Sequence, residues 1–187
     1  MSRHLVAILH SRPPGDGERT LSRIELARAA LGCGSFSVTN LYPASLPNTG
    51  ALSLSANLDV WQLGRDEVSR DLRRTDTTDI LLGYGVKPPT GTQRHAFREQ
   101  LDWLAVELNA QSHRVWAFGG RPNHPSRWQR VAHRYAPDMP IQEIVPVLLA
   151  PFKLGQQKKA DELVTQEIAT LTKSTFRTAP SSGDSKS

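Results

Sequence analysis

Four short apolar runs, each ending in turn-forming residues, are the feature that most constrains the fold of this chain. They span residues 4–9, 36–41, 79–85 and 114–120, with the sequences HLVAIL, FSVTNL, DILLGYG and RVWAFGG. Nearly continuous apolar runs of this length are typical of parallel strands that are buried on both faces. Because crossover helices must join parallel strands, the pattern predicts an α/β fold, a three-layer α/β/α sandwich around a mainly parallel four-stranded sheet.

The segments between these strands have helical periodicity. After the first strand, Ser22 and Glu25 form a predicted capping box at a helix start. Residues 58–74 hold one helix or two, because Gly64 is a candidate break. The apolar segment 141–152 contains two prolines, so we predict a packed strand or extended piece there, followed by a closing helix. Function is expected in the loops after the strands, where open α/β sheets bind their ligands.

Length and composition indicate one domain in a reducing compartment. The chain has 187 residues, of which 38% are hydrophobic, and we predict a single domain over residues 1–173 and a disordered tail over 174–187. Its only cysteine, Cys33, excludes an internal disulfide and a four-cysteine metal site, which favours the cytoplasm. No apolar stretch approaches the roughly 20 residues that span a bilayer, so no membrane partner is expected.

The loop after the first strand carries two carboxylates, Asp16 and Glu18, just before a helix. Either of them could orient or deprotonate a water molecule. The alternative is that both only cap the helix and complement its dipole.

The loop after the second strand begins with Asn40 in the sequence NLYP. An asparagine amide at a ligand-binding edge offers one donor face and one acceptor face to a heterocyclic base. The alternative is an Asx turn before the proline, which is the commoner role of such a residue.

The loop after the fourth strand, GGRPNHPSRW, combines a glycine turn with a histidine. Gly119 and Gly120 allow a tight turn or a close approach to a ligand, and His124 is a candidate proton donor or electrostatic catalyst. Ser126 and the helix start that follows it could take a phosphate. Trp128 could stack on a base, although a tryptophan at a helix start is more often core.

Positive charge is concentrated around that loop. No Asp or Glu lies between His113 and Pro137, a segment with five arginines, and the whole chain has a formal charge of +5. Such a run is usually a solvated face. Here it overlies the predicted ligand edge, which favours an anionic backbone as the partner. The five are Arg114, Arg121, Arg127, Arg130 and Arg134.

The order of these motifs resembles that of the uracil-DNA glycosylase superfamily. The chain has a strand with an acidic loop, then a strand ending in NLYP, and then a strand followed by HPS. The arrangement over residues 4–135 also resembles a small bacterial family of unknown function with the same NLYP and HPS motifs. The resemblance implies a DNA glycosylase that flips a nucleotide from the duplex and hydrolyses its N-glycosidic bond. It is expected to be monofunctional and monomeric and to need no cofactor or metal.

The resemblance also implies roles for individual residues. Asn40 would read the base, His124 would stabilise the departing base anion, and Asp16, more than Glu18, would stabilise the sugar cation and position water. The remaining expected contacts to substrate are Tyr42, Gly119, Gly120 and Asn123, and those to DNA are Arg12, Arg121, Ser126, Arg127, Trp128 and Arg130.

The chain departs from the superfamily pattern in its first motif, because Gly-Gln-Asp-Pro-Tyr is absent. The tyrosine that shields the 5 position of uracil has no evident counterpart, so we expect a damaged or modified base, such as a pyrimidine with a bulky 5-substituent. Defence against phage with modified DNA and ordinary repair both remain open. So do two other functions, a non-catalytic nucleic-acid or nucleotide-binding module and a hydrolase or transferase of free nucleosides.

Overall fold

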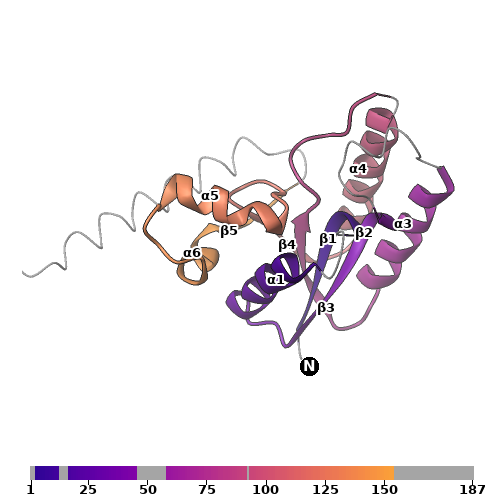
Figure 1. Cartoon of the computed structure of the whole chain (residues 1–187). Helices are drawn as coiled ribbons and strands as arrows, with labels where there is room; N and C mark the ends of the chain where they lie inside the picture. The colour runs from indigo at the N-terminus through magenta and orange to yellow at the C-terminus, as the bar shows by residue number, and fades with distance from the viewer. Residues whose placement is uncertain (1–2, 13–16, 46–57, 92, 154–187) are drawn as a thin grey trace, which may run out of the picture.

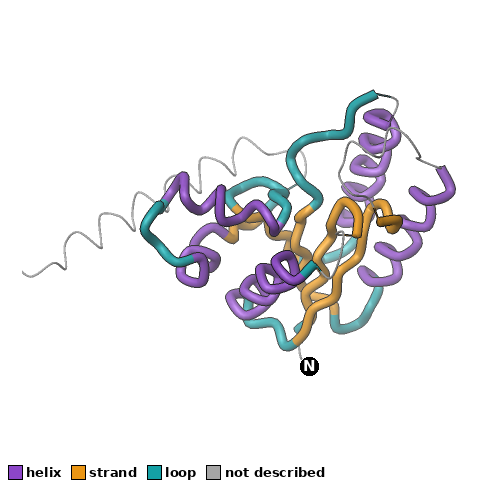
Figure 2. The backbone as a smooth tube through the Cα atoms, viewed as in Figure 1, coloured by secondary structure: helices purple, strands orange, loops and turns teal. Residues whose placement is uncertain are grey.

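The structure, a computed structural model, describes residues 3–12, 17–45, 58–91 and 93–153. In this part of the chain a five-stranded, mostly parallel sheet is flanked by helices on both faces (Figures 1 and 2). The predicted α/β class is confirmed, with five strands in place of the four predicted. The tail over 174–187 and the closing helix predicted before it lie outside the described residues.

The strand order is β2-β1-β3-β4-β5. β1 lies inside the sheet and pairs in parallel with β2 and β3, and β4 extends the parallel arrangement beyond β3. β5 is the exception, because it runs antiparallel to β4. The strands span His4–Arg12 (β1), Ser35–Ser45 (β2), Thr77–Gly83 (β3), Arg114–Phe118 (β4) and Leu149–Pro151 (β5).

Two groups of helices cover the two faces of the sheet. α3 and α4 lie on one face, whereas α1, α5 and α6 lie on the other (Figure 1). No helix in the described ranges combines the length and the apolar character that crossing a membrane requires. The helices span Glu18–Ala30 (α1), Leu58–Leu72 (α3), Gln93–Asn109 (α4), Trp128–Tyr135 (α5) and Ile141–Leu148 (α6), and a 3-10 turn, η2, spans Pro125–Arg127.

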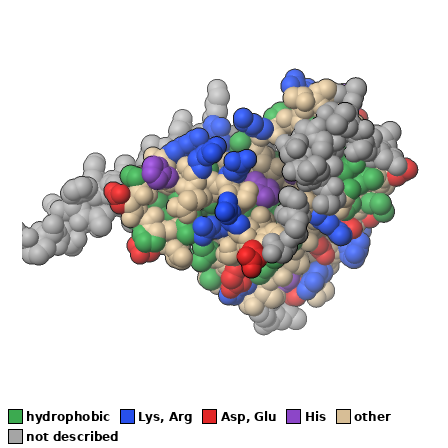
Figure 3. Space-filling view, viewed as in Figure 1, with side chains coloured by type: hydrophobic (Ala, Val, Ile, Leu, Met, Phe, Trp, Pro, Cys, Tyr) green, Lys and Arg blue, Asp and Glu red, His purple; other side chains and the backbone are tan. Residues whose placement is uncertain are grey.

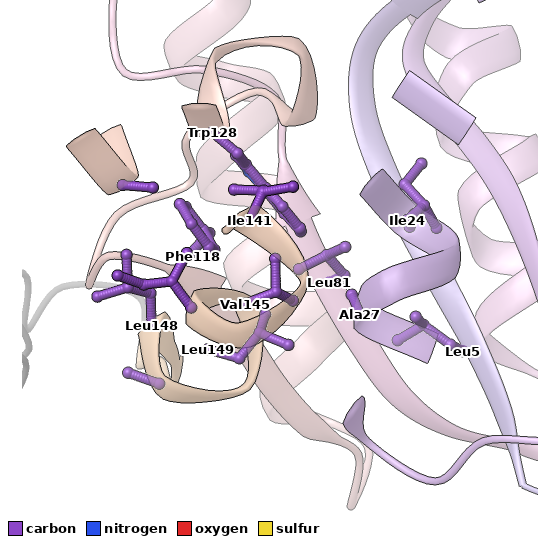
Figure 4. Packing of buried hydrophobic residues seen from close by; sticks show 14 of the residues in the cluster. Leu5, Ile24, Ala27, Leu81, Phe118, Trp128, Ile141, Val145, Leu148 and Leu149 are labelled. Carbon is purple, nitrogen blue, oxygen red and sulfur yellow. The ribbon is translucent and has the colours of Figure 1, made fainter. Parts of the chain in front are cut away.

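Alternation along β1 divides the core in two. Val6 and Ile8 belong to the cluster under α3 and α4, whereas Leu5 and Leu9 belong to the cluster under α1, α5 and α6. All four side chains are fully buried. Figure 4 shows the second cluster, in which side chains from the sheet and from these three helices point toward one another. The apolar runs of the sequence are therefore strands buried on both faces, as predicted.

Gly64 does not break α3, which runs continuously from Leu58 to Leu72. Its role is close packing, because a Cβ at this position would lie 2.2 Å from the carbonyl oxygen of Leu41 in β2. The Asn40 carbonyl oxygen would be 3.2 Å away. The helix therefore fixes the path of β2 where that strand reaches the edge that carries Asn40.

Two local predictions were wrong. α1 begins at Glu18 after Gly17, which adopts a left-handed conformation, so Ser22 lies inside the helix and forms no capping box. Most of the segment predicted as extended is the helix α6, which runs as far as Leu148 despite Pro146, and only its last part, Leu149–Pro151, is a strand. Four apolar side chains at helical spacing are buried in α6, and this burial outweighs the hydrogen bond that proline removes. They are Ile141, Ile144, Val145 and Leu148.

Candidate functional site

The loop that follows β4 packs onto the carboxyl ends of β1 and β3. A Cβ at Gly83, the last residue of β3, would lie 3.0 Å from Pro125 Cδ and 2.9 Å from Leu9 Cδ2. The backbone N–H of Gly85 donates to the carbonyl oxygen of Pro122 over 2.7 Å. The His-Pro-Ser segment is thus held at the sheet edge where parallel α/β proteins bind ligands.

His124 occupies this edge in a defined orientation. It is the N-cap of η2, and its Nδ1 accepts a hydrogen bond from the backbone N–H of Ser126 at 3.3 Å. The Ser126 Oγ lies 2.9 Å from the same nitrogen. Because Nδ1 acts as an acceptor, the proton of the neutral ring resides on Nε2. Burial, and then the positive charge of Arg127, lowers the pKa of His124 and favours this neutral form.

A second histidine, His10, lies near His124 at the end of β1. Its side chain packs against two aromatic rings, with centroid distances of 6.2 Å to Trp61 and 5.3 Å to Phe97. The residue is only 3% exposed, and neither ring nitrogen has a hydrogen-bond partner among the described residues. Burial, and then the charge of nearby His124, lowers the pKa of His10 to about 4. His10 is therefore neutral at physiological pH.

This buried histidine predicts a stability that falls in mild acid. The unfolded chain protonates His10 near pH 6.5, whereas the folded protein does so only near pH 4, so the unfolded state binds more protons between these values. The free energy of unfolding should decrease by up to about 3 kcal/mol as the pH falls through this window. Urea unfolding at several pH values measures it. In His10→Phe the decrease should be smaller, and an unchanged pH dependence would contradict the assignment.

Asn40 lies on the strand next to His10. It pairs in register with Leu9, and its Oδ1 is buried without a hydrogen-bond partner in the described part of the chain. No Asx turn therefore occupies this oxygen. Tyr42 is buried two residues further along and packs edge-on against Trp61, with 4.9 Å between ring centroids. Tyr42 thus belongs to the same aromatic cluster as His10, and its contact with substrate stays a prediction.

Trp128 was wrongly expected to contact DNA. Its side chain is 0% exposed and stacks on Phe118 at a centroid distance of 4.3 Å (Figure 4). Its Nε1 donates to the carbonyl oxygen of Asn123 over 2.9 Å. A ring buried in this way cannot stack on a base, so the alternative reading of a core tryptophan is confirmed.

Two residues that are expected to contact substrate also stabilise the glycine turn. The Asn123 side chain donates from Nδ2 to the carbonyl oxygen of Phe118 over 2.8 Å. The Gly119 N–H donates to the carbonyl oxygen of Leu148 over 2.7 Å. Gly119 and Gly120 have φ values of +64° and +68°, a conformation that favours glycine. The glycines therefore shape the loop that holds His124, and ligand contacts through Asn123, Gly119 and Gly120 stay predictions.

The acidic residues of the first loop are only partly described. Asp16 lies outside the described residues. Glu18 is the first residue of α1 and is exposed, which matches the reading of a carboxylate that complements the helix dipole. The catalytic role of either carboxylate stays a prediction.

Exposed arginines lie at the end of β1, in the loop after β4 and in α5, and Figure 3 shows Lys and Arg side chains gathered on the face that carries α5. We call these residues the arginine patch: Arg12, Arg121, Arg127, Arg130 and Arg134. Arg114 does not belong to it. It begins β4 at the opposite edge of the sheet, where it pairs with Asp79 at 2.9 Å.

The opposite edge also has a surface hollow, lined by residues 72–74, 77–78 and 111–114. Two of its cations are already neutralised, since Arg74 pairs with Asp76 and Arg114 with Asp79. It lies away from the histidines, at the amino ends of β3 and β4. Among the described residues, no group of three or more His, Cys, Asp or Glu side chains could hold a metal ion.

Sequence reasoning missed His10 and the aromatic side chains around it. The available signal was a polar residue at the end of a buried apolar strand, which is uncommon unless the residue is hydrogen-bonded or functional. Trp61 and Phe97 carried no such signal, because aromatic residues on helices are usually core residues. Their position around His10 depends on contacts between β1, α3 and α4.

Comparison of the chain with family models, with curated proteins and with solved structures finds no match. The proposals that follow therefore depend on the sequence motifs and on the geometry of this edge.

Proposed function

We propose that this protein is a monofunctional DNA glycosylase that hydrolyses the N-glycosidic bond of a damaged or modified base and leaves an abasic site. The observation that carries the proposal is the position of His124. The His-Pro-Ser loop holds it at the carboxyl edge of the sheet as a neutral ring with its proton on Nε2, beside exposed arginines. A neutral N–H donor is suited to a leaving group that develops negative charge.

In the proposed reaction the C1′–N bond breaks and its electron pair leaves with the base. Water adds its oxygen to C1′, one water proton ends on the base nitrogen, and the other stays on the new hydroxyl group. His124 donates a hydrogen bond from Nε2 to the base as negative charge develops. A first-loop carboxylate, Asp16 more than Glu18, stabilises the cationic sugar and positions the water. Asn40 hydrogen-bonds the base edge through its Oδ1, which has no partner within the described ranges.

The proposed substrate class is a pyrimidine with a bulky 5-substituent, because the tyrosine that excludes such groups in the superfamily has no evident counterpart. We expect weak release of plain uracil. Duplexes that differ only in the substituent at one pyrimidine measure this preference. Release of uracil at an equal or higher rate would contradict it.

The arginine patch predicts salt-dependent action on polymer DNA. Arg127→Ala combined with Arg130→Ala should weaken DNA binding and reduce the dependence of log Kd on log salt by about two phosphate contacts, a slope change near 1.8. Fluorescence anisotropy of a labelled duplex between 50 and 200 mM salt measures this. Arg74→Ala, at the opposite edge, is the control and should leave the slope unchanged. An unchanged slope in the double variant would exclude Arg127 and Arg130 from the DNA interface.

The experiment that tests the function is mass spectrometry of bases released from a panel of natural and hypermodified DNAs, followed by alkaline cleavage at abasic sites. Release that disappears in Asp16→Asn and His124→Ala supports the glycosylase. Intact DNA that is bound equally well by all variants favours a non-catalytic module. Hydrolysis of mononucleosides that the arginine variants leave unchanged favours an enzyme of free nucleosides.

A further inference from the structure

We propose that His10 is a second hydrogen-bonding group for the ligand at this edge, and that one of its ring nitrogens pairs with a carbonyl or N–H group on the edge of a planar heterocycle. The inference rests on the proposed function, since it assigns the heterocycle as the base. His10 has no part in the roles derived above from the motifs.

The first observation is the lack of hydrogen bonds at a buried ring. His10 is 3% exposed, yet neither Nδ1 nor Nε2 has a partner in the part of the chain that the structure describes. An unpaired buried polar atom costs about 1–3 kcal/mol, so buried polar groups without partners are uncommon and call for a specific explanation. A ligand that supplies one of the missing hydrogen bonds would explain why this side chain is histidine rather than an apolar residue.

The other buried histidine of β1 makes the contrast clear. His4, at the amino end of the strand, is equally buried, but its Nδ1 lies 2.8 Å from Ser35 Oγ and its Nε2 lies 2.9 Å from Ser37 Oγ. The fold therefore provides partners for a structural histidine in the same strand. Over the ranges that the structure describes it provides none for His10, which lies at the proposed ligand-binding edge near His124.

The neighbours of His10 define the chemistry of the ligand. Trp61 and Phe97 are in ring contact with it, and Tyr42 and Tyr84 extend the same aromatic cluster. Such surroundings favour a planar, uncharged ring over a phosphate or a carboxylate. Burial keeps His10 neutral, so the ring offers one N–H donor and one nitrogen acceptor at the same time. The two nitrogens point away from each other, so one ligand edge pairs with one of them. A pyrimidine carbonyl suits the N–H donor, and a pyrimidine N–H suits the acceptor.

The test uses the full chain labelled with ¹⁵N-histidine and four free bases as probes: uracil, thymine, 5-hydroxymethyluracil and 5-hydroxymethylcytosine. The ring nitrogen signals of His10 should shift on addition of at least one base, and those of His4 should not, because Ser35 and Ser37 already occupy its nitrogens. His10→Phe assigns the signals and keeps an aromatic ring against Trp61 and Phe97. No shift at His10 with any of the four would overturn the proposal.

Measurements of base-release rates distinguish the proposed role of His10 from the proposed glycosylase function. In His10→Phe, the ratio of release rates for the best and the next-best base should fall at least tenfold, whereas the Kd for undamaged duplex should stay unchanged. His95→Phe, on the exposed surface of α4, is the matched control. If His10→Phe still releases bases and the ratio of the two release rates is unchanged, the role of His10 is overturned but the glycosylase function is not. A shift at His10 without release from any DNA would keep His10 as a ligand group and overturn the glycosylase.

Discussion

Replacing His124 with alanine is expected to lower the rate of base release by about 100- to 1,000-fold, the effect of losing one pre-oriented donor to a developing negative charge. The ring is pre-oriented because its Nδ1 is fixed by the backbone N–H of Ser126, which leaves Nε2 as the donor. Burial lowers the pKa of His124, so little of this donor is lost to protonation at neutral pH. Single-turnover release of the base from the best substrate measures the rate of the chemical step.

The control for this variant separates chemistry from folding, because His124 also caps η2. Asparagine at position 124 can accept the N–H of Ser126 and should restore the thermal stability, but its shorter amide should not restore the rate. Ser126→Ala removes the hydroxyl contact at 2.9 Å and should slow release less than His124→Ala does. Equal rates for wild type and His124→Ala at full stability would remove His124 from the mechanism.

The second large effect is expected at Asp79, near the amino end of β3. This carboxylate is 0% exposed and accepts hydrogen bonds from five side chains. Burial by itself raises the pKa of Asp79, but the hydrogen bonds donated to it hold the pKa below its usual value, so the group is ionised at neutral pH. The five donors are Arg3, Thr78, Arg114, Trp116 and Cys33.

Asp79→Ala should lower the free energy of unfolding by about 3 kcal/mol, because it leaves several donors without a buried acceptor. The value is at the low end of the range for buried ion pairs, since the Arg3 and Arg114 side chains are 35% and 51% exposed and remain in contact with water. Urea unfolding followed by tryptophan fluorescence measures it.

The matched control is Asp76→Ala, which removes a nearby carboxylate from an exposed pair with Arg74. This change should have little effect on stability, as is usual for surface ion pairs. Equal stability of Asp79→Ala and Asp76→Ala would show that the buried cluster contributes nothing to the fold. Because Asp79 lies at the sheet edge opposite His124, base release per folded molecule should be unchanged in either variant.

The strands could be predicted because their signal is local. The runs that contain Val6, Ile8 and Leu82 are apolar at nearly every position, which only burial on both faces explains. The helix α6 was missed for the opposite reason. Pro146 gave a strong local signal against a helix, and the burial of Ile144 and Leu148, which stabilises that helix, depends on α1, α5 and the sheet.

The residues of the candidate site also fall into those that a local signal predicts and those that only contacts between distant residues place. The position of His124 followed from the strand and the glycine turn before it, because residues after parallel strands meet at one edge. The role of Trp128 could not be predicted from the sequence, because a tryptophan at this position is suited both to stacking on Phe118 and to stacking on a base.

The sequence by itself determined which segments are buried strands and which loops follow them, because apolar runs and positive-φ glycines set the conformation of the residues next to them in the chain. Only the tertiary structure decided that His10 has no hydrogen-bond partner among the described residues and lies near His124, that Arg114 is on the far edge, and that Trp128 is core. These facts depend on contacts between residues far apart in the chain, and no local preference encodes such contacts.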